Sequence, residues 1–369
     1  MKKNMRILAL LLAMLLTVAC LTACGKKENE ETAGPSGGEE ASGFDYSKGI
    51  GDDGYWEGIK ASELVTLPDY KHLTVSQSEL TAAQEEIEAE AEYLMSGFEY
   101  DAEVTGAVEL GDTVNINYAG KTDGEAFDGG TGNNPSLELG SGAFIPGFEE
   151  ALVGHEVGTT FDIDVTFHET YAEDLAGKDA VFTIELLSAT RPTIPELTDA
   201  FVQENLSASG SQTVEDIYAL LKEGIEASKL QNYVRDYITQ NTTANELPES
   251  MIEYQKGANE EYYKTYAAYY GVDMETFLSY VLDVTTVEEM HETFADEYKD
   301  QVKQLLALQA VAEKEKIKVT ADDVAEYFYN YYGSSDYSGY EDFYGLPYLL
   351  SAALSEKAIN AVCDMVTIE

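Results

Sequence analysis

Two short motifs contain residues that could bind a metal ion. Residues 168–172 and 291–295 both begin with His-Glu, as the H-E-x-x-H motif of zinc proteases does. In that motif a second histidine, one helical turn later, is also a metal ligand, but Ala172 and Ala295 occupy this position here. The glycine-rich loop at 129–134 lacks the Gly-Lys-Ser/Thr sequence that completes a phosphate-binding loop. We therefore expect neither a metal site nor a cofactor.

Cys24 is a candidate for covalent attachment of lipid. Three basic residues precede an apolar run at residues 7–19, which is the order of a secretory signal peptide, and the run is too short to span about 30 Å of hydrocarbon. Residues 21–25, Leu-Thr-Ala-Cys-Gly, resemble a bacterial lipobox. We expect residues 1–23 to be a lipoprotein signal peptide and Cys24 to be lipidated. A plain secretory peptide, or lipidation at Cys20, are the alternatives.

The composition is strongly acidic, with 69 Asp and Glu against 22 Lys and Arg and a formal net charge of −47. Phosphate binding depends on clustered basic residues, and the arginines are only Arg6, Arg191 and Arg235, so we expect no nucleic-acid partner. A length of 369 residues suggests two or three domains. Residues 26–43 contain no large apolar side chain, which predicts a flexible tether that we assign to residues 24–62.

The middle of the chain has the pattern of β-strands. Apolar side chains alternate with polar ones at residues 114–118, 161–167 and 182–186, as in strands with one buried face. Pro146 comes just before residues 148–152, and this predicts one short helix with proline at its start. The simplest architecture is a small antiparallel sheet wrapped on a short helix.

Two motifs open this region, Gly-Asp-Thr-Val-Asn-Ile-Asn-Tyr-Ala-Gly at 111–120 and Gly-Glu-Ala-Phe-Asp-Gly-Gly at 124–130. Four further motifs follow in order, at residues 137–149, 154–158, 175–178 and 195–201. Together these motifs resemble those of FKBP-type peptidyl-prolyl isomerases, in the trigger-factor branch. The resemblance covers roughly residues 67–329. It implies an FKBP-like antiparallel sheet domain at residues 105–191 and an all-α chaperone domain with helical arms at residues 192–369, hence an α+β multidomain protein.

The resemblance also implies a pocket that accelerates rotation about X–Pro peptide bonds. Rotation crosses a barrier of about 18–20 kcal/mol and breaks no covalent bond, so an apolar pocket that favours the twisted amide is sufficient. By family position Phe148 is the floor, where small FKBPs carry Trp, and the Ile145 backbone N–H binds the substrate carbonyl. Asp128 orients the site or polarises the amide. The implied pocket residues are Tyr118, Phe127, Asp128, Phe144, Ile145, Phe148, Tyr171 and Phe182. Without the family, these aromatic residues fit a sheet core and Asp128 a turn.

Helical periodicity flanks the sheet region. Leu80, Ile87 and Leu94 are seven residues apart and predict one helix at residues 76–95, which by analogy packs on the chaperone domain. We accordingly assign residues 63–104 to a linker and this helix. The N-terminal ribosome-binding domain of the family is missing from the motifs found, so we expect no ribosome partner.

Further helices are predicted in the C-terminal part. Capping pairs at 213/216 and 320/323 each predict a helix start, Pro248 and Gly271 bracket another helix, and residues 287–316 form a long one. Tyrosines recur between residues 254 and 348. Because a tyrosine has a large apolar ring and a polar end, such residues can line a cradle for unfolded chains. Equally, many of them fit the helical core.

These observations together predict an extracytoplasmic foldase that is lipid-anchored to the outer face of the bacterial cytoplasmic membrane. It isomerises X–Pro bonds and holds unfolded, newly translocated, proline-containing polypeptides. A non-enzymatic holdase with a vestigial isomerase domain is one alternative. A surface-binding lipoprotein is another.

Overall fold

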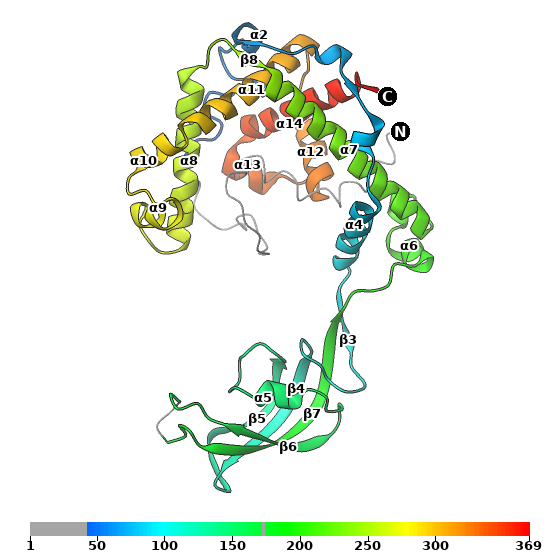
Figure 1. Cartoon of the computed structure of the whole chain (residues 1–369), viewed down its shortest axis with the longest axis vertical. Helices are drawn as coiled ribbons and strands as arrows, with labels where there is room; N and C mark the ends of the chain where they lie inside the picture. Colours follow the sequence, from blue (N-terminus) through cyan, green and yellow to red (C-terminus); the bar gives the residue numbers. More distant parts are fainter. Residues whose placement is uncertain (1–42, 172–173) are drawn as a thin grey trace. The chain divides into compact units, whose positions relative to one another are not determined.

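The computed structural model describes residues 43–171 and 174–369. The predicted signal peptide, Cys24 and residues 24–42 of the predicted tether lie outside the described residues. The described chain divides into two compact units (Figure 1). The sheet unit runs from Glu92 to Phe201, and the helical unit combines the described residues up to Ala91 with Val202–Glu369.

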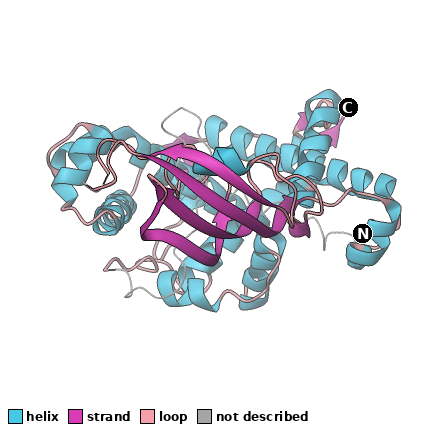
Figure 2. Cartoon of the chain, turned by 90° about the horizontal axis from the view of Figure 1, so that it is seen from below, coloured by secondary structure: helices cyan, strands magenta, loops and turns pink. Residues whose placement is uncertain are grey.

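The core of the sheet unit is one five-stranded antiparallel sheet with one short helix packed on it (Figure 2). Its elements are β3 (Tyr100–Glu103), β4 (Thr113–Thr122), β5 (Glu125–Glu138), α5 (Phe148–Leu152), β6 (Thr160–Thr166) and β7 (Asp179–Thr193). The long strand β7 organises the sheet, because β4 pairs along one edge of it while β6 and then β3 pair along the other. β5 pairs with the free edge of β4.

The alternation of apolar residues places one face of this sheet in a core. Val114 and Ile116 of β4 and Ile184 and Leu186 of β7 have no exposed surface. α5 packs against β6 and buries Phe148 and Leu152 in the same core. The predicted antiparallel sheet wrapped on a short helix is confirmed.

The sheet unit extends beyond the residues that the sequence indicates. The predicted linker and helix at residues 63–104 are wrong at their C-terminal end, because β3 pairs with β7 there and Tyr100 lies opposite Thr193. Beyond the ladder, the rings of Phe98 and Phe201 meet edge to face at 5.0 Å. β7 continues to Thr193, and its C-terminal end pairs with β3. The first and last strands of the unit therefore lie side by side.

The helical unit is built around α11. Leu306, Ala307, Ala310 and Val311 of this helix are fully buried, and α2, α7, α8 and α14 pack on it. Its helices are α2 (Ala61–Leu64), η1 (Tyr70–His72), α3 (Gln77–Leu80), α4 (Gln84–Ser96, which continues into the sheet unit), α6 (Asp199–Asn205), η2 (Ser207–Ser209), α7 (Val214–Asn241), α8 (Glu249–Tyr269), α9 (Met274–Leu282), α10 (Val287–Thr293), α11 (Ala295–Glu315), α12 (Ala321–Tyr332), α13 (Ser338–Tyr344) and α14 (Leu346–Cys363). Two short ladders join β1 (Val65–Thr66) to β8 (Thr243–Ala244) and β2 (Thr74–Val75) to β9 (Thr367–Ile368).

The predicted starts of three helices and the predicted end of one are confirmed, and two predicted long helices are wrong. Capping boxes at the starts of α7 and α12 confirm the two predicted capping pairs, and α8 lies between Pro248 and Gly271 as predicted. The single helices predicted at 76–95 and 287–316 are wrong, because each is broken in two. Thr81, with φ −56° and ψ 126°, leaves the helical conformation after α3, and Phe294 interrupts the second helix. The spacing of apolar residues cannot reveal a break in a helix when the two shorter helices bury side chains on the same face.

The prediction of a flexible tether is wrong for residues 43–62, which we call the strap. Ile50, Trp56 and Ala61 of the strap are buried in the helical unit. The Trp56 backbone N–H donates a hydrogen bond to Oε1 of Gln309 at 3.0 Å. Unlike residues 26–43, the strap carries large apolar side chains, and their burial can offset the entropy of ordering it.

The tyrosine-rich stretch after α12 is part of the packed structure. α12 ends at Gly333, whose φ of +70° favours glycine, and α13 follows. The rings of Tyr332, Tyr337 and Tyr340 surround Phe328 at centroid distances of 5.2, 5.6 and 4.8 Å. These tyrosines therefore serve packing within the helical unit.

Candidate active site

An aromatic cluster forms where β4, β5, β7 and α5 meet. Phe148 of α5 is fully buried, stacks on Phe144 at a centroid distance of 4.6 Å and meets the edge of Phe182 at 5.3 Å. Tyr118 lies 6.0 Å from both Phe148 and Phe182, and Phe127 lies 5.9 Å from Phe182. Tyr118, Phe127 and Phe144 are only half-buried. The cluster thus has the closed floor and partly open aromatic walls expected of an apolar pocket.

Glycines in the strands make room for these rings. A Cβ atom on Gly120 would lie 2.5 Å from Cε1 of Phe182, and one on Gly132 would overlap the ring of Tyr118. Neither glycine needs a left-handed backbone, so the close approach of the ring is what requires glycine here. The rings consequently lie directly on the backbone of the sheet.

Ile145 lies in the turn between Phe144 and α5. Its carbonyl accepts a hydrogen bond from the N–H of Phe148 at 3.0 Å. Within residues 43–171 and 174–369, no group accepts a hydrogen bond from the Ile145 N–H. This donor next to the floor is available for a carbonyl of a bound chain.

Asp128 and Tyr171 lie at the margin of the cluster. Asp128 follows Phe127 in β5 and is exposed, and no hydrogen bond to its side chain is found in the described part of the chain. Tyr171 is 47% exposed. In the part of the chain that the structure describes, its ring reaches the cluster through Phe167, 4.9 Å away, whose ring is 5.6 Å from that of Phe127. The structure therefore brings together six of the eight predicted pocket residues and leaves these two at the edge.

Two buried carboxylates near this core are not singled out by the sequence patterns. Asp112 accepts hydrogen bonds from Nε and Nη2 of Arg191 at 2.6 and 2.8 Å, and this pairing, against the effect of burial, lowers the pKa of Asp112. Glu149 follows Phe148 in α5 and binds the backbone of residues 140–144. Both lie inside motifs that also contain other polar residues, so the sequence pattern does not distinguish them as buried.

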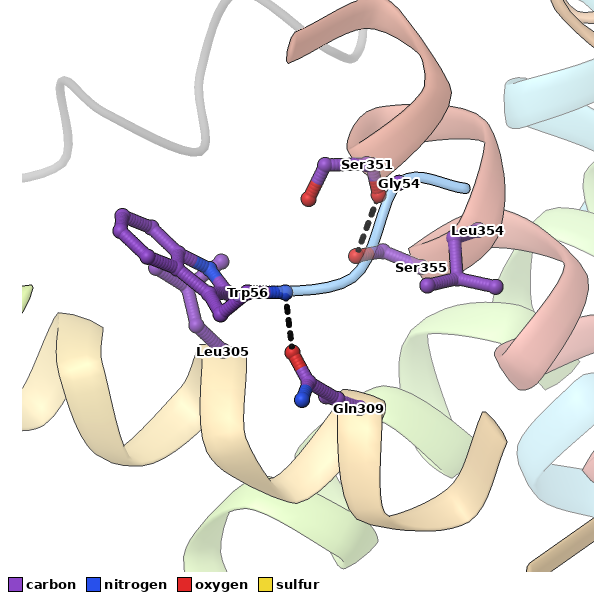
Figure 3. A pocket seen from close by; sticks show the side chains of 7 residues that line it. All are labelled: Gly54, Trp56, Leu305, Gln309, Ser351, Leu354 and Ser355. Carbon is purple, nitrogen blue, oxygen red and sulfur yellow. Dashed lines mark hydrogen bonds between the residues drawn. The ribbon is translucent and has the colours of Figure 1, made fainter. Parts of the chain in front are cut away.

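A small cavity lies in the helical unit (Figure 3). It has a volume of about 10 Å³, which is enough for about one water molecule. Its lining residues are Gly54, Trp56, Leu305, Gln309, Ser351, Leu354 and Ser355. It is too small for a polypeptide segment, so the aromatic cluster remains the candidate site.

Three further features bear on chemistry and location. Among residues 43–171 and 174–369, no three His, Cys, Asp or Glu side chains gather closely enough to hold a metal ion. The half-buried Cys363 is a free thiol whose pKa is raised to about 12, mainly by burial. Within the same described stretches, no helix combines the length and apolar character needed to cross a bilayer.

Comparison with known proteins identifies the class of each unit. Residues 105–187, which contain the aromatic cluster, match the family of FKBP-type peptidyl-prolyl cis-trans isomerases. Residues 212–364 of the helical unit match the C-terminus of the bacterial trigger factor protein. The chain therefore carries an FKBP-type peptidyl-prolyl isomerase domain in its sheet unit, and most of its helical unit is similar to the C-terminus of trigger factor.

The chain is also similar to individual trigger factors. The chain is 36% identical over 264 residues to the trigger factor of Exiguobacterium sp., which covers 70% of this chain and 60% of the relative. It is 36% identical over 275 residues to that of Ligilactobacillus salivarius, covering 70% and 61%. The chain thus spans about three fifths of the length of these relatives. A solved structure described as "Promiscuous Substrate Recognition in Folding and Assembly Activities of the Trigger Factor Chaperone" matches with a TM-score of 0.38 and 18% identity, over 81% of this chain and 72% of that chain.

Proposed function

We propose that the aromatic cluster catalyses cis–trans isomerisation of X–Pro peptide bonds. The observation that carries the proposal is the buried floor of Phe148 with the half-open walls of Tyr118, Phe127 and Phe144. A proline ring is apolar and fits such a pocket. Twisting the amide weakens its resonance and its dipole, so the twisted form loses less than the planar form when it leaves water.

Backbone and side-chain groups around the floor have separate roles in this proposal. The N–H of Ile145 donates a hydrogen bond to a carbonyl of the bound chain and fixes its position. The half-buried rings of Tyr118, Phe127 and Phe144 contact the proline ring. The buried rings of Phe148 and Phe182 support these walls from beneath. Asp128, exposed at the margin, stabilises the rotating amide only if the substrate brings its amide to that edge. No bond is broken, so no proton transfer is needed.

We further propose that the helical unit holds unfolded, newly translocated polypeptides. Tyr269, Tyr270 and Tyr280, at the ends of α8 and α9, are 80%, 64% and 83% exposed. Exposed tyrosine rings bury large apolar areas on contact at a low cost in side-chain entropy, which suits transient binding of many sequences. The exposed surface of Val281 adds to this area.

The proposed location is the outer face of the bacterial cytoplasmic membrane, with the chain attached through lipidated Cys24 and independent of the ribosome. The lipobox-like sequence at residues 21–25 supports this. Expression in a bacterium fed a labelled fatty acid tests it, with Cys24→Ser as the control. Label in the wild type and none in the variant is expected. Unlabelled wild-type protein would refute the anchor.

Proline-limited refolding of a client protein, with aggregation followed by light scattering, separates the foldase from the holdase alternative. We expect the wild type to accelerate the slow phase and to suppress aggregation. Phe148→Ala together with Asp128→Ala should abolish the first effect and spare the second. If the wild type suppresses aggregation but never accelerates the slow phase, the protein is a non-enzymatic holdase. The positions of Asp128 and Tyr171 at the margin of the cluster favour this alternative.

A further inference from the structure

Glu149 is a buried carboxylate directly beside the floor of the candidate site. It follows Phe148 in α5 and is only 4% exposed. Glu150 and Glu156, the carboxyl groups nearest to it in the sequence, are both exposed. Burying a single carboxylate costs free energy unless several hydrogen bonds compensate, so the position calls for an explanation.

The Glu149 carboxylate binds the loop that leads to the site. Oε2 accepts hydrogen bonds from the N–H groups of Gly140 at 2.8 Å and Gly142 at 3.0 Å, and Oε1 accepts one from the N–H of Phe144 at 3.0 Å. Ser141 Oγ is 3.5 Å from Oε1. Burial alone would raise the pKa of Glu149, but these backbone donors outweigh it and lower the pKa below its ordinary value.

The loop has the backbone that this arrangement requires. Gly140 and Gly142 have φ of +103° and +72°, in the region that favours glycine. Their conformations help to direct the N–H groups of alternate residues, Gly140, Gly142 and Phe144, toward one anion, much as backbone nests do. The loop therefore fits a carboxylate, and a neutral side chain could accept fewer of these hydrogen bonds.

We propose that Glu149 is a positioning residue for isomerisation, which holds Phe144 against Phe148 and thereby places the Ile145 N–H for the substrate. Phe144 is the last residue bound by the carboxylate and stacks on the floor at 4.6 Å. Glu150 supports the other side of the turn, because its Oε2 accepts the Gly147 N–H at 3.1 Å. This role rests on the proposed isomerase function.

Variants of the full chain test the proposal by kcat/KM for cis–trans isomerisation of a proline-containing tetrapeptide. Glu149→Gln keeps the side-chain volume but removes the charge and one acceptor, and we expect kcat/KM to fall about tenfold because a small misplacement of a binding group is costly. Glu149→Asp restores the carboxylate and should recover part of the loss. Glu156→Gln removes an exposed carboxylate of the same unit and should match the wild type. Circular dichroism at the assay temperature confirms that each protein is folded.

NMR of the wild type, labelled with ¹⁵N-glycine and ¹⁵N-phenylalanine, supplies a readout that needs no variant. The amide signals of Gly140, Gly142 and Phe144 should titrate together, with one apparent pKa below the ordinary value of a glutamate. Independent titration of these amides would overturn the loop-holding role. So would wild-type kcat/KM in folded Glu149→Gln. If the wild type itself lacks isomerase activity, the proposed function fails, and the common titration alone then decides whether Glu149 holds the loop.

Discussion

Gly120 offers a test of the pocket that alters no aromatic residue. In Gly120→Ala the added Cβ would lie 2.5, 2.8 and 2.9 Å from three carbon atoms of the Phe182 ring. Carbon atoms in proteins pack at about 3.5–4.0 Å, so the ring must move by about 1 Å. Phe148 and Phe127, at 5.3 and 5.9 Å from Phe182, restrict that movement. The displaced ring must therefore disturb the floor or a wall of the pocket.

The expected magnitudes follow from this displacement. Overpacking a sheet core costs about 1–3 kcal/mol, so the sheet unit should lose this much free energy of unfolding in urea. A shift of about 1 Å in a binding group lowers catalysis by up to about a hundredfold, and we expect kcat/KM for prolyl isomerisation to fall tenfold or more. Both values are measured on the same purified variant.

Gly106 provides the matched control. It belongs to the same unit, and a Cβ on it would meet no atom within 4 Å. Gly106→Ala should match the wild type in both kcat/KM and stability. If folded Gly120→Ala isomerises the peptide within twofold of Gly106→Ala, Phe182 is not part of the site.

Three further predictions concern other parts of the molecule. Trp56→Ala removes a buried indole from the strap and should lower the free energy of unfolding of the helical unit, measured in urea, by about 3–5 kcal/mol. Arg191→Ala leaves the buried Asp112 unpaired and should destabilise the sheet unit by about 2–3 kcal/mol at neutral pH. The pKa of Asp112 is lowered in the folded state, so its pairing with Arg191 stabilises the sheet unit fully above a pH of about 4. This stabilisation is lost as pH falls through the folded-state pKa of Asp112. The free energies of unfolding of wild type and variant, measured in urea, should therefore converge in acid. Tyr269→Ser with Tyr280→Ser should weaken suppression of aggregation, measured by light scattering, and leave isomerisation unchanged.

Matched variants of the same regions serve as controls for these three predictions. Lys48→Ala alters an exposed side chain of the strap, and equal stability of Trp56→Ala and this control would show that the strap is dispensable. Arg191→Lys keeps the charge and should retain part of the stability. If the difference in free energy of unfolding between wild type and Arg191→Ala does not change with pH, the stabilisation does not come from the Asp112 carboxylate. Tyr269→Phe with Tyr280→Phe keeps the rings, and loss of aggregation suppression in that pair would show that the hydroxyl groups, not the rings, bind clients.

The period of the apolar residues predicts the sheet core because its strands bury one face each. Val114, Ile116, Ile184 and Leu186 occupy the expected positions. The same periodicity fails where a helix breaks without changing its buried face, as it does between α10 and α11. It also fails for the strap, whose buried side chains follow no regular period and pack on helices distant in the sequence.

The sequence predicts part of the candidate site, as it predicts part of the fold. Motif resemblance indicates the aromatic residues, and the structure gathers Tyr118, Phe127, Phe144, Phe148 and Phe182 around one floor. Local sequence cannot show that Gly120 lies under the Phe182 ring, or that Glu149 turns back to bind residues 140–144, since both depend on contacts between separate elements.

The rate at which the purified chain isomerises a proline-containing tetrapeptide tests the proposed isomerase site most directly. We expect a rate above the uncatalysed one that rises in proportion to protein concentration and is lost in Phe148→Ala. If circular dichroism shows a folded sheet unit and the rate stays at the uncatalysed value, the aromatic cluster is not an isomerase site.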